Sequence, residues 1–222
     1  MYKRQGHHSG YRNFECDDAA TNLVPWAFLI GGEELHNNHH AFPTSAKFSM
    51  RKWEFDIGWL YIRILSTFGL AKVRKVAPKP VLEHEQKPAE IDNLKAIIVN
   101  RMHVLRDYTK QVTLPAFRTE RAMAAGNRTL RRAKRLLVRQ PKLLDQQAME
   151  RLHEVLADSA TLKTVHEFRE RLRELWSGAN VSNERLVAQL KQWCAEAEAS
   201  GIKVLEDFAA RLRAYQLAPV AS

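Results

Sequence analysis

The C-terminal half of the sequence has a long, helix-like spacing of apolar residues, and this pattern constrains the fold more than any other feature. Between Ile91 and Tyr215, leucines and other apolar residues recur every three and four positions, which places them on one face of an α-helix. Residues that typically end helices interrupt the pattern at Pro115, Gly126, Pro141, Gly178 and Gly201. We therefore predict four or five amphipathic helices that pack as a small bundle.

The expected helices can be outlined from these interruptions. They run from Ile91 to about Ala125, Asp145 to Leu156, Leu162 to Trp176, Ser182 to Ser200, and Ile202 to Tyr215. Pro115 should bend or end the first helix, and Ser182 is a residue type that caps a helix start. Five large side chains on these helices are expected in the core, namely Met102, Met149, Trp176, Trp193 and Phe208.

A polar linker separates this half from the rest of the chain. Between Ala77 and Pro88 the sequence is rich in proline and charged residues, a composition typical of connecting segments. We place the domain boundary after residue 82, which gives two parts, 1–82 and 83–222. Because both parts read as helical, the predicted fold class is all-α.

The N-terminal part contains a cluster of three histidines. His36, His39 and His40 are spaced i, i+3 and i+4, so their side chains fall on one face of a helix, and neutral imidazole is a good ligand for transition metals. Glu33 and Glu34 precede them. These two glutamates either orient the imidazoles through the second ring N–H or lie in solvent at the helix start. The spacing predicts a metal site without identifying the metal.

Other residue types add few functional candidates. Cys16 and Cys194 lie in different segments and form no metal pair or disulfide framework. The remaining histidines of the C-terminal half are far apart and are expected to be ordinary surface or core residues: His84, His103, His153 and His166. The sequence has no glycine-rich phosphate loop and no nucleophile motif. We therefore predict no catalytic residue other than metal ligands.

The formal net charge of +10 is concentrated in two places. Lys72, Arg74 and Lys75 follow the aromatic and aliphatic stretch 53–70, and this arrangement suits either a membrane surface or a core helix with a basic end. The second place is the acid-free run 128–142, which suits either DNA phosphates or a solvated helix face. Because it lacks residues typical of base readout, we favour the solvated face.

The histidine cluster and its flanks resemble a known family. Gly6 to Glu15 lies upstream, the box itself reads His36-Asn37-Asn38-His39-His40, and Ala41 to Lys47 and Trp53 to Trp59 lie downstream. Together they resemble the C-terminal end of the catalytic core of membrane fatty acid desaturases of the bacterial and animal delta-9 acyl-CoA type. The resemblance covers about residues 6–80.

The resemblance implies four iron ligands in this chain. Desaturases of this kind bind two irons through three histidine boxes and one further histidine in a His-x-x-Gly-x-Arg stretch. The third box corresponds to His36, His39 and His40, and the further histidine to His7, with Gly10 and Arg12 in register; adjacent His8 is the next candidate. The family has an asparagine where this chain has Lys3.

The resemblance also implies an activity and partners. The iron pair would activate O₂ and introduce a double bond into an acyl chain bound to coenzyme A or to a lipid. A ferredoxin, rubredoxin or cytochrome would supply electrons, and this part of the enzyme would face the cytoplasmic side of the membrane. Since the family's first two boxes and spanning helices would precede residue 6, we expect a truncated piece that is inactive alone.

The helical part is similar to a second family. The segment from Arg131 to Tyr215, above all Leu190 to Glu198 and Phe208-Ala209, is similar to the helical C-terminal end of bacterial insertion-sequence transposases. The alternative function is therefore a DNA-binding or transposase-like module in residues 83–222, although we predict that nucleic acid is not a partner. A similar tail occurs on some bacterial desaturases.

Overall fold

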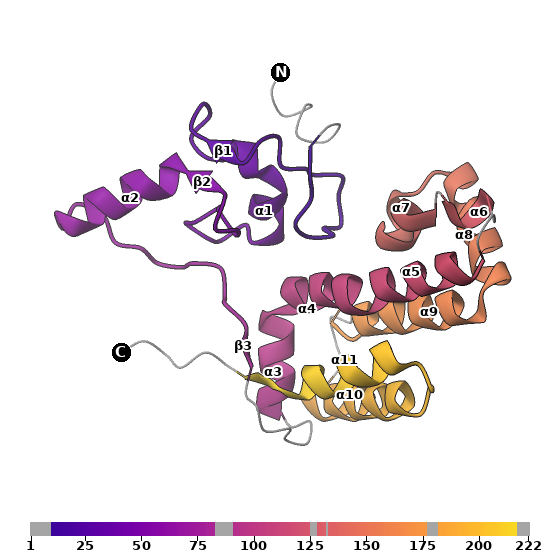
Figure 1. The fold of residues 1–222 in the computed structure, drawn as a ribbon. Helices are drawn as coiled ribbons and strands as arrows, with labels where there is room; N and C mark the ends of the chain where they lie inside the picture. The colour runs from indigo at the N-terminus through magenta and orange to yellow at the C-terminus, as the bar shows by residue number, and fades with distance from the viewer. Residues whose placement is uncertain (1–9, 83–90, 125–127, 132, 177–181, 217–222) are drawn as a thin grey trace. The chain divides into compact units, whose positions relative to one another are not determined.

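The computed structural model describes residues 10–82, 91–124, 128–131, 133–176 and 182–216 (Figure 1). The chain forms two compact units, residues 1–78 and 79–222. The predicted boundary after residue 82 lies at the start of residues 83–90, outside the described part.

The first unit consists of short elements and loops. Its elements are β1 (Trp26–Ala27), the 3₁₀ helix η2 (Glu33–Leu35), α1 (His36–Ala41), β2 (Phe55–Asp56) and α2 (Ile57–Thr67). β1 and β2 pair in parallel, with Trp26 opposite Phe55 and Ala27 opposite Asp56. An isolated antiparallel bridge joins Tyr11 to Asn22. Most of the described residues of this unit are therefore in loops.

Two local features position the histidine segment. Gly32, with φ 109°, allows the backbone to turn into η2, which leads directly into α1. Asp56 begins α2 by accepting a hydrogen bond from the Trp59 N–H at 2.9 Å. Its other carboxylate oxygen accepts bonds from the N–H groups of Phe48 at 2.6 Å and Ser49 at 3.1 Å. The loop after α1 is thus tied to the start of α2.

The second unit is a helical bundle. Its elements are β3 (Val81–Leu82), α3 (Ile91–Val99), α4 (Arg101–Tyr108), the π-helix η3 (Thr109–Thr113), α5 (Leu114–Met123), α6 (Arg128–Arg131), α7 (Ala133–Val138), the 3₁₀ helix η4 (Pro141–Leu143), α8 (Gln146–Asp158), α9 (Ala160–Glu174), α10 (Asn183–Glu198), α11 (Lys203–Arg213) and β4 (Tyr215–Gln216). β3 pairs antiparallel with β4. The long α4–η3–α5 segment lies beside α9 (Figure 1).

Aromatic side chains fill the centre of this bundle. Trp193 packs edge-on against Phe168 and Phe208, and Tyr108 against Phe208, with ring centroids between 5.0 and 6.3 Å apart. The buried Trp193 N–H donates to the Phe168 carbonyl at 2.9 Å, and the Tyr108 hydroxyl donates to the Val165 carbonyl at 2.7 Å. These bonds satisfy the polar groups of the largest core side chains.

The mostly helical architecture confirms the predicted fold class, with corrections to individual helices. The expected single helix 91–125 is broken at Asn100, whose side chain and backbone N–H both donate to the Ala96 carbonyl, at 2.9 Å and 3.0 Å. Pro115 neither ends nor breaks the segment, because it follows the π-helical turn η3 at the start of α5. The short α6, α7 and η4 were not predicted, so the estimate of four or five helices was wrong.

Most of the predicted core residues are confirmed. Trp193 and Phe208 are fully buried, and Met149 and Trp176 pack partly buried against the same core. Met102 is half-buried on α4 and does not belong to that cluster. No helix among the described residues is long and apolar enough to cross a bilayer.

Candidate metal centre

Helix α1 presents the three histidines of the cluster on one face. The ring centroids lie 4.2 Å apart for His36 and His40, 5.8 Å for His39 and His40, and 6.3 Å for His36 and His39. An imidazole nitrogen binds a metal at about 2 Å, so two rings that share an ion have centroids no more than roughly 6 to 7 Å apart. All three separations fit that limit.

The two asparagines between the histidines point the other way and are fully buried. The Asn37 carboxamide accepts the N–H groups of Asn13 at 2.8 Å and Phe14 at 2.9 Å, and donates to the Phe14 carbonyl at 2.8 Å. It also donates to the Ala20 carbonyl at 3.1 Å. Asn37 therefore attaches the loop 13–20 to the back of α1, which leaves the histidines on the more accessible face.

Asn38 connects α1 to a buried carboxylate, Glu54. Glu54 is 7% exposed and accepts hydrogen bonds from Asn38 Nδ2 at 2.9 Å and from the Tyr11 hydroxyl at 2.8 Å. Its remaining donors are Asn13 Nδ2 and the N–H groups of Met50 and Arg51. Burial, together with the hydrogen bond and charge of Glu54, raises the pKa of Tyr11 far above its usual value. Tyr11 therefore remains a neutral donor to this carboxylate.

The two glutamates before the helix have different roles. Glu33 Oε2 lies 3.1 Å from His36 Nδ1, so it can orient this ring. This is the first of the two alternatives given for Glu33 above. Glu34 is buried and accepts the N–H groups of Leu29 at 2.6 Å and Ile30 at 3.0 Å. Glu34 therefore neither orients a histidine nor lies in solvent, and both alternatives were wrong for it. Its carboxylate stabilises the preceding turn.

An aspartate that the sequence analysis missed contacts the third histidine. Asp18 Oδ2 forms a short hydrogen bond with His40 Nδ1. The contact joins residues 22 positions apart, and no local sequence signal indicates it. Partial burial acts to raise the pKa of Asp18, but bonds from the Ala20 N–H and from His40 outweigh it and hold that pKa below its usual value.

Arg12 fixes the loop that carries Asp18. Its guanidinium donates to the carbonyls of Asp18 at 3.0 Å, Ala20 at 2.7 Å and Cys16 at 3.3 Å. Gly10, two residues earlier, has φ 128°, and a side chain there would collide with the backbone of Asn22. The glycine and arginine of the upstream motif thus have structural roles in shaping this loop.

His39 differs from its two neighbours. Its Nδ1 is buried and has no hydrogen-bond partner among the residues that the structure describes, and its ring lies 4.6 Å from that of Phe48. An imidazole nitrogen that is buried without a partner is costly unless the other nitrogen provides compensation, for example by binding a metal. The His39 ring would therefore suit a transition-metal ligand.

The described residues alone do not complete a metal site. Within 10–82 and the described ranges of the second unit, no three His, Cys, Asp or Glu side chains are arranged to hold one ion by themselves. In a site that holds two metal ions, the histidines of one helix can be divided between the two ions. His7 and His8 lie outside the described residues, so the predicted ligand set of His7, His36, His39 and His40 stays a prediction.

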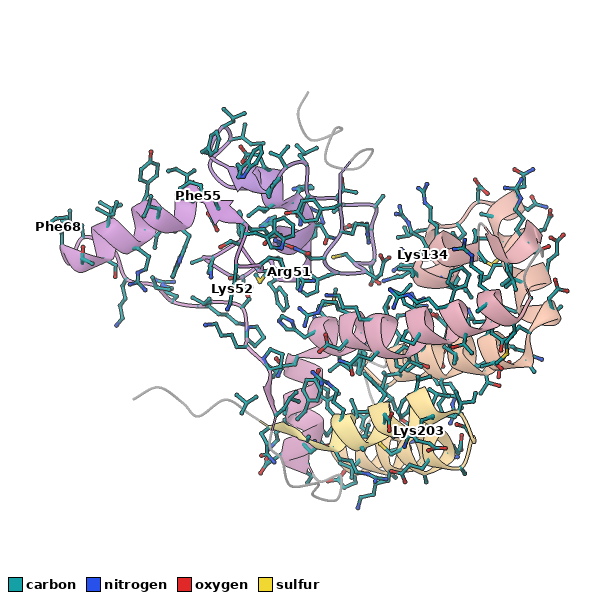
Figure 2. All side chains as sticks on the ribbon, viewed as in Figure 1. Arg51, Lys52, Phe55, Phe68, Lys134 and Lys203 are labelled. Carbon is teal, nitrogen blue, oxygen red and sulfur yellow. The ribbon has the colours of Figure 1, made fainter. Side chains whose placement is uncertain are left out.

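The first unit also exposes a large apolar surface, which we call the aromatic surface. It comprises Trp26, Phe28, Leu29, Trp53, Phe55, Leu60, Tyr61, Ile64, Leu65, Phe68 and Leu70. No residue of α2 is buried, and the surface extends from Phe55 on β2 to Phe68 after α2 (Figure 2). The alternative of a buried core helix in this region was therefore wrong.

The basic run of the second unit lies along α6, α7 and η4. Lys134 is exposed on α7 (Figure 2), and Arg135, Arg139 and Arg151 line a cavity of about 680 Å³ together with apolar residues such as Leu136. Asp145 and Glu154 line the same cavity, so its charge is mixed.

The N-terminal third is similar to fatty acid desaturases. It is 46% identical over 71 residues to sn-2 palmitoyl-lipid 9-desaturase of Nostoc sp. (strain 36), covering 32% of this chain and 24% of that protein. It is 42% identical over 73 residues to sn-1 stearoyl-lipid 9-desaturase of Anabaena variabilis, covering 33% and 27%. It is 38% identical over 81 residues to Acyl-CoA 5-desaturase AL21 of Anemone leveillei, covering 36% and 24%. The chain thus has a desaturase-like region and spans about a quarter of the length of these relatives.

The helical unit matches a different family. The ISL3-type family described as Transposase matches residues 92–220, which is more than half of the chain. By this match the chain belongs to that transposase family, and its N-terminal third carries the desaturase-like region in addition. No solved structure matches the chain.

Proposed function

We propose that the first unit is the third-histidine-box region of an O₂-dependent di-iron fatty acid desaturase. The observation that carries this proposal is the histidine face of α1, in which His36 and His40 are each held at Nδ1 by a carboxylate. Metal-bound histidines are typically held in this way at the nitrogen that does not bind the metal. Similarity to three acyl desaturases over the same region supports it.

In this proposal the ligands are His7, His36, His39 and His40. Two bound non-haem irons would supply the activation of O₂ needed to remove two hydrogens from an acyl chain. Asn37, Asn38 and Glu54 would keep the histidine face rigid from behind. Since these four histidines do not complete two iron sites, we expect no desaturation by the chain as written.

The aromatic surface suits a lipid environment. Large apolar side chains gather there, and Lys52, Arg63, Lys72 and Arg74 are exposed nearby in sequence. Apolar side chains with adjacent cations favour an anionic, cytoplasmic membrane surface. We therefore propose a membrane-associated enzyme region that acts on an acyl-lipid or acyl-CoA and receives electrons from a separate donor protein.

A chimeric enzyme tests this function. The 71-residue segment of the Nostoc desaturase that aligns with this chain is replaced by the corresponding residues of this protein. Gas chromatography of acyl chains from cells that express the chimera should show the unsaturated product of the parent enzyme. An inactive chimera that accumulates in the membrane at the parent's level would contradict the proposal.

Single substitutions in the chimera separate ligands from structure. His36→Ala, His39→Ala and His40→Ala should each abolish the product and lower the iron content. Thr44→Ala is the control, because Thr44 is exposed and lies outside the histidine face. Activity that survives any of the three histidine substitutions would remove that residue from the ligand set.

The family of the second unit favours a second candidate function, DNA binding. The supporting observation is the cavity lined by Arg135, Arg139 and Arg151, of which Arg135 and Arg151 are exposed. Arginines neutralise DNA phosphates, and the affinity that results falls steeply with salt. The full chain should then bind duplex DNA with an affinity that falls as the salt concentration rises. In Arg135→Ala and in Arg151→Ala, the slope of log affinity against log salt concentration should be smaller by about one, because each variant loses one phosphate contact. Lys191→Ala on α10 is the control, and unchanged slopes in both arginine variants would argue against this function.

A further inference from the structure

We propose that Asp18 and Glu33 are positioning residues that fix the proton of His40 and His36 on Nδ1, so that each neutral ring carries its lone pair on Nε2. The identity of the metal rests on the proposed function, but the assignment of the protons does not. Neither carboxylate would itself touch the iron or the substrate.

Asp18 can act only as an acceptor toward His40. Its Oδ1 accepts the Ala20 N–H at 2.9 Å, and its Oδ2 contacts His40 Nδ1. An ionised carboxylate has no proton to donate, so the neutral ring must carry its proton on Nδ1. The lone pair of the neutral ring is then on Nε2.

The fold places Asp18 at this position independently of any metal. Arg12 holds the Asp18 and Ala20 carbonyls, and Asn37 of α1 holds the Ala20 carbonyl from the other side. The helix that carries His40 therefore also anchors the turn that carries Asp18. Such an arrangement keeps the ring orientation fixed before a metal arrives.

Glu33 has the same role for His36 at shorter range. It lies three residues before His36, in the 3₁₀ turn that leads into α1, and its Oε2 is 3.1 Å from Nδ1. Its side chain is 47% exposed, compared with 41% for that of Asp18. Within the described part of the chain, no second contact fixes its carboxylate in the way that the Ala20 N–H fixes that of Asp18, so its control over the tautomer should be weaker.

The isosteric substitution Asp18→Asn gives a specific test. The asparagine oxygen can keep the bond with the Ala20 N–H, which turns the NH₂ group toward His40 Nδ1. The ring nitrogen must then accept, so the proton of His40 should move to Nε2 while the shape of the loop is kept. A purely structural role of Asp18 would not produce this inversion.

Nuclear magnetic resonance of the full chain with ¹⁵N-labelled histidine distinguishes the two tautomers. At a pH about two units above the ordinary imidazole pKa of about 6.5, the ¹⁵N shifts of each ring report whether it is neutral and which nitrogen carries the proton. We expect Nδ1–H for His40 and His36 in the native chain. Asp18→Asn should convert His40 to Nε2–H, and Glu33→Gln should shift His36 partly in the same direction. Asp17→Asn, which removes the same charge one residue away, should leave both rings unchanged.

The outcomes separate this proposal from the proposed function. A native His40 in the Nε2–H form, or one that Asp18→Asn leaves as Nδ1–H with an otherwise native amide spectrum, would overturn the proposal. Calorimetry with Co²⁺ provides the second measurement, in which Asp18→Asn should lower the affinity about 10-fold or more. If the native chain showed the expected tautomers but the chimera contained no iron, the metal function would be wrong and the positioning correct.

Discussion

At the scale of single residues, the histidine cluster depends on polar groups that are buried behind it. Glu54 accepts bonds from five donors in two loops and helix α1, and Asn37 and Asn38 are completely inaccessible. Buried polar groups of this kind are costly when a partner is lost. They explain why two asparagines occupy the positions between the histidines.

Loss of the Glu54 carboxylate should therefore loosen the first unit. Glu54→Ala leaves the Asn38 amide, the Tyr11 hydroxyl and two backbone N–H groups without their acceptor, at a cost of roughly 3 kcal/mol or more. Hydrogen exchange followed by mass spectrometry should show faster exchange in peptides from 36–56. Peptides from α8 to α11 serve as the internal control. Equal protection in native and variant chains would show that this network contributes little.

His166 gives the second unit a dependence on pH. Burial and the charges of Arg169 and Arg173 lower its pKa to about 4, from about 6.5 in an unfolded chain. The unfolded state therefore binds a proton first as pH falls from 7 toward 4, which costs the folded state at most about 3 kcal/mol. His166→Gln should unfold in urea with a smaller loss of stability over this pH range. Identical pH dependence in both chains would contradict the burial of a neutral ring.

At the scale of elements, the sequence predicted helices well where they are long and amphipathic. The last four predicted helices correspond to α8, α9, α10 and α11, and Ser182 caps α10 as expected. The histidine face of α1 was predictable because its spacing is local. Asp18 was not, because its contact with His40 depends on a loop that is closed by Arg12 and Asn37. The break at Asn100 and the π-helical turn before Pro115 depend on side-chain competition and tertiary packing, which periodicity does not report.

Helix α2 should bind lipid through its exposed side chains. Vesicles that contain phosphatidylserine should sediment the full chain, and Ile64→Glu with Phe68→Glu should reduce the bound fraction about 10-fold or more, because each apolar side chain contributes roughly 1.5 to 3 kcal/mol. Met123→Glu is the matched control, since Met123 is an apolar residue on α5 that is more exposed than either Ile64 or Phe68. Equal losses for both variants would indicate nonspecific adhesion.

At the scale of the whole molecule, the chain combines a desaturase-like region with a helical unit of a transposase family. The second unit has its own core, in which every member belongs to residues 94–215. Residues 83–222 should therefore unfold cooperatively when expressed alone, with the helical circular dichroism of a folded bundle. A non-cooperative transition would show that this unit needs the remainder of the chain.

The most direct measurement combines both parts in the desaturase chimera. The Nostoc enzyme that carries the aligned segment of this chain is expressed with and without residues 83–222 at its C-terminus, and its iron content and unsaturated acyl product are measured together. We predict two irons and product in both forms, because the histidine face lies entirely in the first unit. Absence of iron and product from both forms, at normal membrane levels of the protein, would contradict a desaturase role for His36, His39 and His40.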